Sequence, residues 1–220
     1  MRGGLELRVD GTLASSLRPG RGLTGIVWWA LAAPVLLLPR PPRPRVLLLG
    51  LAAGSVARAL RALDPDAEIV GVELDDEVLR AASEQFGLDE LRLEVVHGDA
   101  LAFLRRERRL FDLIVEDLFL GPSRCVHKPR WLAGEGYRLI RRRLRREGLL
   151  VSNTIHEMPQ IARAARLPGG RVVTLDVRDY HNRIVVAGRA LPAPRELRRL
   201  LAQRPEIARL LDRLEIRSRH

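Results

Sequence analysis

The 220-residue sequence contains a single cysteine, Cys125. One cysteine excludes a disulfide bond within the chain and is typical of proteins in a reducing compartment, so we expect a cytoplasmic protein. Cys125 and His127 have a spacing found in metal sites. Because no second pair of ligands follows nearby, we expect no bound metal.

Long hydrophobic runs are also missing. The most apolar stretch, IVWWALAAPVLLL, runs only from Ile26 to Leu38 and contains Pro34. A helix that spans a bilayer needs about 20 apolar residues. The stretch also lacks the compact basic start of a signal peptide. We therefore expect a buried helix here and no membrane partner.

Lysine and aromatic residues are scarce, although the chain is strongly basic. The net charge is +11, yet among 38 Lys and Arg residues only Lys128 is a lysine, and aromatic residues make up 4%. The charge alone would suit nucleic acid. However, the arginines are scattered, and few aromatic side chains are available for base stacking. We do not expect a nucleic-acid partner.

The densest arginine run supports an alternative, an anion-binding module. Such a module would use Arg138, Arg141, Arg142, Arg145 and Arg146 of this run. Helical spacing spreads these residues around a helix whose Leu139, Ile140 and Leu144 would face the core. A solvated outer face explains the run better, and tight, salt-sensitive RNA binding would favour the module.

Strand-like and helix-like segments alternate through the middle of the chain. The expected strands are 46–50, 68–73, 91–96, 111–116 and 149–153, and the expected helices are 55–63, 75–86, 101–108, 131–146 and 159–166. This alternation predicts an α/β fold with a parallel sheet covered on both faces. Residues 171–188 read as two strands with a short turn, which must pair antiparallel.

The two ends of the chain differ from this pattern. Residues 5–17 alternate around Asp10-Gly11, a dipeptide that favours a β-hairpin turn. The tail reads as two short amphipathic helices broken at Pro205. We therefore expect an N-terminal β-hairpin element at 1–22, a main domain at 23–190 that begins with a helix at 23–38, and a helical tail at 191–220.

Polar groups and glycines follow four of the expected strands. Gly50 and Gly54 bracket a sharp turn, Glu73 ends the second strand, and Asp99 and Asp117 follow the third and fourth. Ligands of open α/β sheets bind outside the carboxyl ends of the strands. Glu73 is placed to accept ribose hydroxyls and Asp99 an adenine amine, although Asp99 alone could simply cap the next helix. Together these residues predict a nucleoside site.

The turn GLAAGS argues against a dinucleotide. The pyrophosphate fingerprint would need glycine at 50, 52 and 55, but Ala52 and Ser55 occupy the last two positions. A ligand without phosphates, such as S-adenosylmethionine, needs less close backbone approach.

In these motifs the chain resembles the spermidine synthase-like branch of the class I S-adenosylmethionine-dependent transferases. The resemblance spans about residues 5–190 through PRVLLLGLAAGS, IVGVELDDEVLRAA, VVHGDALAFL, FDLIVEDLFLGP and GLLVSN. It implies a Rossmann-like class I methyltransferase fold, with a mostly parallel seven-stranded sheet, an antiparallel C-terminal hairpin and a small N-terminal β-hairpin. It also implies S-adenosylmethionine or its decarboxylated form as cofactor, with Asp117 as the catalytic residue. The cofactor contacts implied are Gly50, Leu51, Ala52, Gly54, Glu73, Leu74, Asp99, Ala100 and Asp117.

Several residues depart from the family pattern for polyamine binding. Ala53 replaces an aspartate expected to hold the cofactor's amine, Leu120 replaces a second acidic residue, and the helix GIVWWALAAP lacks the expected tyrosine and glutamate. Each lost charge-assisted hydrogen bond is worth about 1.5–3 kcal/mol. We therefore expect methyl transfer to a small-molecule acceptor rather than aminopropyl transfer to putrescine.

Two other functions and several minor assignments remain open. The first function is a polyamine aminopropyltransferase, and the second is a noncatalytic nucleoside-binding scaffold. Asn153 and His156 follow the fifth strand and could line the acceptor side, although His156 reads better as a plain loop residue. A homodimer is a possible assembly.

Overall fold

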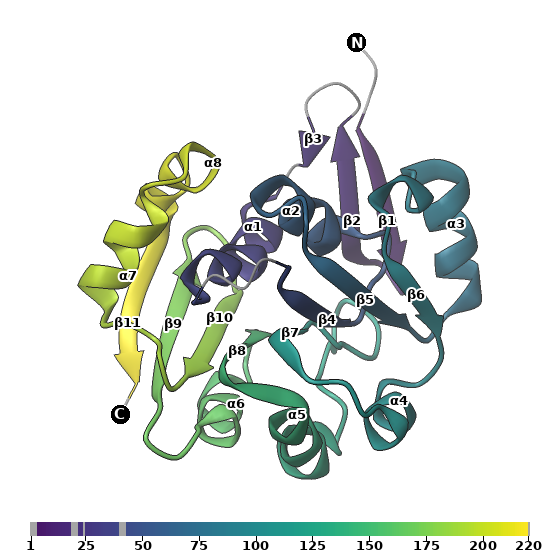
Figure 1. Cartoon of the computed structure of the whole chain (residues 1–220). Coiled ribbons are helices and arrows are strands. Elements are labelled where there is room, and N and C mark those ends of the chain that lie inside the picture. Colours follow the sequence, from purple (N-terminus) through teal and green to yellow (C-terminus); the bar gives the residue numbers. More distant parts are fainter. Residues whose placement is uncertain (1–3, 19–21, 24, 40–42, 220) are drawn as a thin grey trace.

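Residues 4–18, 22–23, 25–39 and 43–219 are described by the computed structural model. They form a small three-stranded sheet and a main eight-stranded sheet flanked by helices (Figure 1). The main-sheet strands are β4 (Arg45–Leu49), β5 (Glu68–Glu73), β6 (Glu94–His97), β7 (Phe111–Glu116), β8 (Leu144–Thr154), β9 (Arg171–Val177), β10 (Arg183–Gly188) and β11 (Leu214–Arg219).

The strand order of the main sheet is β11-β9-β10-β8-β7-β4-β5-β6. The five strands from β8 to β6 are parallel, whereas β10 runs antiparallel to both β8 and β9. The predicted parallel sheet with an antiparallel end is therefore confirmed. The apolar run of β4 makes it a central strand, because Val46–Leu49 are at most 1% exposed and both faces of the sheet are covered.

Two apolar cores lie on opposite faces of the sheet. One contains buried residues of α1 (Ile26–Ala32), α2 (Ser55–Leu63), α3 (Asp76–Phe86), α7 (Pro194–Leu201) and α8 (Pro205–Ala208). The other contains residues of α4 (Ala100–Arg106), α5 (Tyr137–Arg143) and α6 (Met158–Ala165). Because the helices cover the two faces of the sheet, the carboxyl ends of the parallel strands lie at an edge where a ligand can approach.

The N-terminal sheet consists of β1 (Leu5–Val9), β2 (Thr12–Arg18) and β3 (Gly22–Leu23). The Asp10-Gly11 turn joins β1 and β2, and both residues have positive φ angles of 47° and 79°. Such angles suit this dipeptide in a hairpin turn. Figure 1 shows this sheet beside α2, which contacts β2 and β3.

The C-terminal tail differs from the expected pair of helices. Helices α7 and α8 are present, but β11 follows them and pairs antiparallel with β9 as an eighth strand. Leu214 is buried and Ile216 is partly buried, an alternation of period two that suits a strand. The closely spaced leucines at 210, 211 and 214 resemble a helical pattern, which explains the wrong prediction.

The expected helix at 131–146 is also shorter and less regular than predicted. It begins with a π-helical turn, Leu132–Gly136, and continues as α5, while β8 already starts at Leu144. Leu139, Ile140 and Leu144 are buried, as expected for the core-facing side. Within the described ranges, none of the helices is long and apolar enough to cross a bilayer.

Candidate nucleoside and acceptor site

A cavity of about 780 Å³ lies at the carboxyl ends of β4, β5, β6 and β7. The predicted site residues that line it are Gly50, Leu51, Ala52, Glu73, Leu74, Asp99, Ala100 and Asp117. The N-terminal sheet, α1 and residues 117–131 form its other walls. The structure thus places the expected groups around one cavity, while their roles as ligand contacts stay predictions.

Position 50 requires glycine because of both its backbone angle and the atoms that lie close to it. Its φ is 85°, and a Cβ atom added to it would lie 2.7 Å from the Asp117 carbonyl oxygen. The turn after β4 therefore touches the segment after β7. Gly54 is not among the described residues that line the cavity, and its role as a cofactor contact stays a prediction. Its φ is 77°, and its added Cβ would meet Leu88 and Leu91, so packing explains this glycine.

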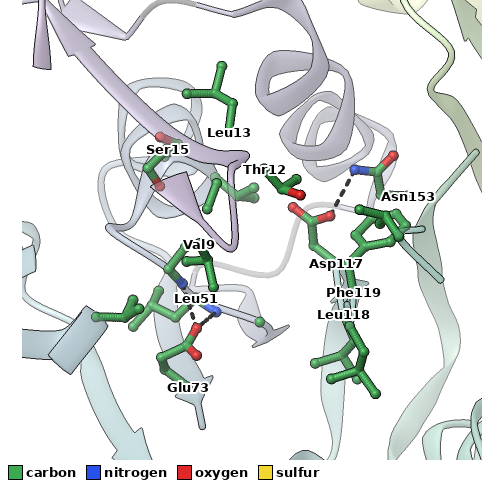
Figure 2. A pocket seen from close by; sticks show the side chains of 18 of the residues that line it. Val9, Thr12, Leu13, Ser15, Leu51, Glu73, Asp117, Leu118, Phe119 and Asn153 are labelled. Carbon is green, nitrogen blue, oxygen red and sulfur yellow. Dashed lines mark hydrogen bonds between the residues drawn. The ribbon is translucent and has the colours of Figure 1, made fainter. Parts of the chain in front are cut away.

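Glu73 holds the turn with its carboxylate. Oε2 accepts hydrogen bonds from the backbone N–H groups of Leu51 (3.2 Å) and Ala52 (2.8 Å), as Figure 2 shows. Oε1 accepts from the N–H groups of Leu74 (2.9 Å) and Asp75 (3.2 Å). The side chain expected to bind ribose therefore also fixes the shape of the turn.

Asp99 and Asp75 cap the helices that follow them, as the simpler interpretation of Asp99 predicted. Oδ1 of Asp99 accepts from the Ala102 N–H (2.8 Å), and Oδ1 of Asp75 accepts from the Glu77 N–H (2.9 Å). Capping occupies only one oxygen of Asp99. Its other oxygen accepts no hydrogen bond from the described residues. Since Asp99 also lines the cavity, capping and ligand binding are compatible.

Asp117 lies deep in the cavity at the end of a chain of amides. Its Oδ1 accepts from Asn153 Nδ2 (2.8 Å, Figure 2), and Asn153 Oδ1 accepts from Asn182 Nδ2 (2.9 Å). Asn182 thereby fixes which end of the Asn153 amide faces the carboxylate. Burial raises the pKa of Asp117 to about 6, and the charge of Lys128 and the Asn153 hydrogen bond oppose this rise.

A buried ion pair lies beside Asp117. Lys128 Nζ is 2.7 Å from Glu116 Oε1, and the two side chains are 5% and 0% exposed. The ammonium also lies 3.9 Å from the centroid of the Phe119 ring. Glu116 Oε1 additionally accepts from the Leu118 N–H (2.8 Å). Through Glu116, these contacts hold in place both the start of the segment after β7, at Leu118, and its far part, at Lys128.

The N-terminal hairpin forms a wall that sequence reasoning did not assign to the site. Ser15 Oγ accepts from the Ala53 N–H (3.0 Å), and the Asp10 carbonyl accepts from the Ser123 N–H (3.1 Å). The hairpin thus bonds to both the turn after β4 and the segment after β7. Thr12 and Leu13 line the cavity from this side. The adjacent small polar residues Ser15 and Ser16 are the sequence feature from which a contact of the hairpin with the site could have been predicted.

Other expected residues are placed as follows. Asn153 lines the cavity, whereas His156 does not. Of the two tryptophans in GIVWWALAAP, Trp28 lines the cavity and Trp29 does not. Cys125 is exposed, and within the described part of the chain no three metal-ligating side chains cluster. Asn182 and Tyr180, which line the cavity from the turn between β9 and β10, were missed. No sequence signal marked them.

Comparisons with known proteins agree with this architecture. A family model described as a methyltransferase domain matches residues 46–148. The probable polyamine aminopropyl transferase of Bifidobacterium longum is 28% identical over 178 residues, which cover 76% of this chain and 38% of that protein. This chain therefore spans less than two fifths of that relative's length.

Two solved structures share the fold. The probable spermidine synthase from Corynebacterium glutamicum aligns with a TM-score of 0.76 and 18% identity, covering 98% of this chain and 83% of that chain. Human Methyltransferase-like protein 13, solved in complex with SAH, aligns with a TM-score of 0.61 and 23% identity. The alignment covers 85% of this chain and 90% of that chain. The predicted methyltransferase fold is confirmed.

Proposed function

Because this chain has the class I methyltransferase fold and resembles spermidine synthases, we propose that it is a transferase that binds S-adenosylmethionine or a close analogue. We further propose that it transfers the methyl group to a small acceptor. The observation that carries the proposal is the convergence of Gly50, Glu73, Asp99 and Asp117 on one cavity of about 780 Å³. A cavity of this size is typical of small-molecule sites.

The donor side of the cavity suits a nucleoside without phosphates. The open oxygen of Asp99 would accept the adenine amine, and the Glu73 carboxylate would accept ribose hydroxyls at the edge of the turn that it holds. The positive φ of Ala52, 46°, lets the chain turn sharply without a glycine at that position. When bound, the sulfonium cofactor would supply a carbon attached to a good leaving group.

Asp117 would position the acceptor and accept its proton. With a pKa raised to about 6 by burial, this carboxyl is mostly ionised at neutral pH and has a proton affinity suited to general base catalysis. Asn153 holds one carboxylate oxygen in place. The other oxygen is left for the acceptor.

Methyl transfer is preferred because the anchors for a dicationic acceptor are missing. Ala53 is 2% exposed and has no carboxylate of its own, and its backbone N–H donates to Ser15 Oγ. Leu120 and Trp28 line the cavity where charged groups would be needed. Sequence similarity to a probable aminopropyl transferase supports aminopropyl transfer as the second candidate.

Calorimetry with S-adenosylmethionine and SAH tests the proposal. We expect both to bind wild-type protein and to bind at least tenfold more weakly to Asp99→Ala. Ser83→Ala, on the exposed side of α3, should leave the affinity unchanged. If neither compound binds, the chain is a scaffold and not a transferase. Spermidine formation from putrescine and decarboxylated S-adenosylmethionine at enzymatic rates would replace methyl transfer by aminopropyl transfer.

A further inference from the structure

The acceptor side of the cavity has one free carboxylate. We define the acceptor side as the cavity-lining residues of α1, residues 117–131, Asn153, Ile155 and the turn at 180–182. Asp117 is the sole acidic residue among them in the described chain. The surrounding groups include Trp28, Phe119 and Leu120, so the side is mainly apolar and aromatic.

Other carboxylates near the acceptor side are either paired or exposed to solvent, and of these Glu6 and Asp10 also line the cavity. Glu116 is buried but pairs with Lys128 at 2.7 Å. Glu6 is exposed and pairs with Arg8 at 2.9 Å. Asp10 is exposed at the tip of the hairpin. A second ammonium group that lay against the apolar residues of this side would have to be buried without a partner, which strongly disfavours binding.

Thr12 supplies an unused polar group beside Asp117. Its Oγ1 is buried and has no hydrogen-bond partner within the described residues. Figure 2 shows the Thr12 side chain directed toward the Asp117 carboxylate across the cavity. Asp117 Oδ1 is bonded to Asn153, whereas Oδ2 accepts no hydrogen bond in the described chain. A buried hydroxyl without a partner is costly, so a ligand group that reaches it gains affinity.

We propose that the acceptor is a primary amine with one cationic centre and an apolar or aromatic body, bound through its nitrogen between Asp117 Oδ2 and Thr12 Oγ1. Thr12 would then be a specificity-determining residue contributed by the N-terminal hairpin. The apolar body would lie against Trp28, Phe119 and Leu120. This inference rests on the proposed function and names its acceptor class.

Pentylamine and putrescine form a matched pair of probes, because they have the same number of non-hydrogen atoms and differ in the second ammonium group. Calorimetry on the full chain, with and without saturating SAH, should show pentylamine binding at least tenfold more tightly than putrescine. Thr12→Val should weaken pentylamine binding about tenfold, the usual effect of one hydrogen bond to a charged group. Thr12→Ser should restore it. Thr174→Val, a buried threonine outside the cavity, should have no effect.

The outcomes separate this inference from the proposed function. Putrescine binding as tightly as pentylamine, or Thr12→Val binding pentylamine like the wild type, would overturn the inference. If SAH binds and neither amine does, the amine class is wrong while the proposed function stands. If pentylamine binds in a Thr12-dependent way and SAH does not, the amine site stands and the proposed function fails. Folding of each variant is checked by its thermal unfolding curve.

Discussion

The ammonium of Lys128 lies 2.7 Å from Oε1 of Glu116, and both side chains are almost completely shielded from solvent. Lys128 is also the single lysine among 38 basic residues. The space around the Lys128 ammonium is narrow, because this group lies between the Glu116 carboxylate and the ring of Phe119, whose centroid is 3.9 Å away. A compact ammonium suits such a site better than a planar guanidinium, which needs more donors satisfied.

Replacing Lys128 by methionine should destabilise the protein strongly. Lys128→Met leaves Glu116 charged and buried without its partner, which typically costs about 3–5 kcal/mol of the free energy of unfolding. Urea denaturation measures this change. Arg80→Met removes the exposed pair with Asp76 (3.2 Å) and should cost less than about 1 kcal/mol. Equal effects of the two substitutions would show that the buried pair does not stabilise the fold.

Asp117→Asn should change how stability depends on pH. The pKa of Asp117 is raised to about 6 in the folded chain, so its protonation stabilises the fold. This stabilisation is fully present below about pH 3.9, the usual pKa in unfolded chains, and is lost as pH rises through about 6. The asparagine variant does not lose this stabilisation. As the pH rises from 4 to 7, its free energy of unfolding should therefore rise by about 3 kcal/mol relative to that of the wild type. Parallel stability curves in urea would contradict the prediction.

Gly50→Ala should be more damaging than an ordinary glycine substitution. At Gly50 an added Cβ meets the Asp117 carbonyl oxygen at 2.7 Å in addition to the strain of a φ of 85°. We expect a loss of about 2–4 kcal/mol. Gly169 has a φ of 69° with open space around its Cβ, so Gly169→Ala should cost only about 1 kcal/mol. Similar thermal unfolding of both variants would refute the close contact.

Ser15→Ala tests the hairpin as a support of the ligand site. The change leaves the Ala53 N–H without its acceptor in a buried position, which should cost about 1–2 kcal/mol. Because this N–H belongs to the turn after β4, SAH affinity measured by calorimetry should fall as well. The exposed Ser83→Ala serves as control. A loss of stability with unchanged SAH affinity would limit Ser15 to a structural role.

Much of the main sheet could be predicted because its signals are local. The apolar run Val46–Leu49 and the residues that follow each parallel strand identified both the strands and the edge at which a ligand would lie. The Asp10-Gly11 turn likewise identified the hairpin. These features follow from strand periodicity and turn chemistry, which act within a few residues.

The remainder depends on contacts between distant segments. Strand β11 forms because β9 offers it a free edge, a fact that the sequence of residues 214–219 does not contain. Likewise, Thr12 and Asn182 reach the cavity only through the packing of the hairpin and of the β9–β10 turn. The double use of Glu73, as a ligand candidate and as the acceptor for four backbone N–H groups, could not be read from its position in a strand.

The absence of a side chain at Gly50 has a thermodynamic consequence. Because this turn touches the backbone of Asp117, a ligand that shifted the turn would also shift Asp117. If the proposed nucleoside binds in this way, it changes the affinity for the proposed acceptor, and by reciprocity the acceptor changes the affinity for the nucleoside by the same factor.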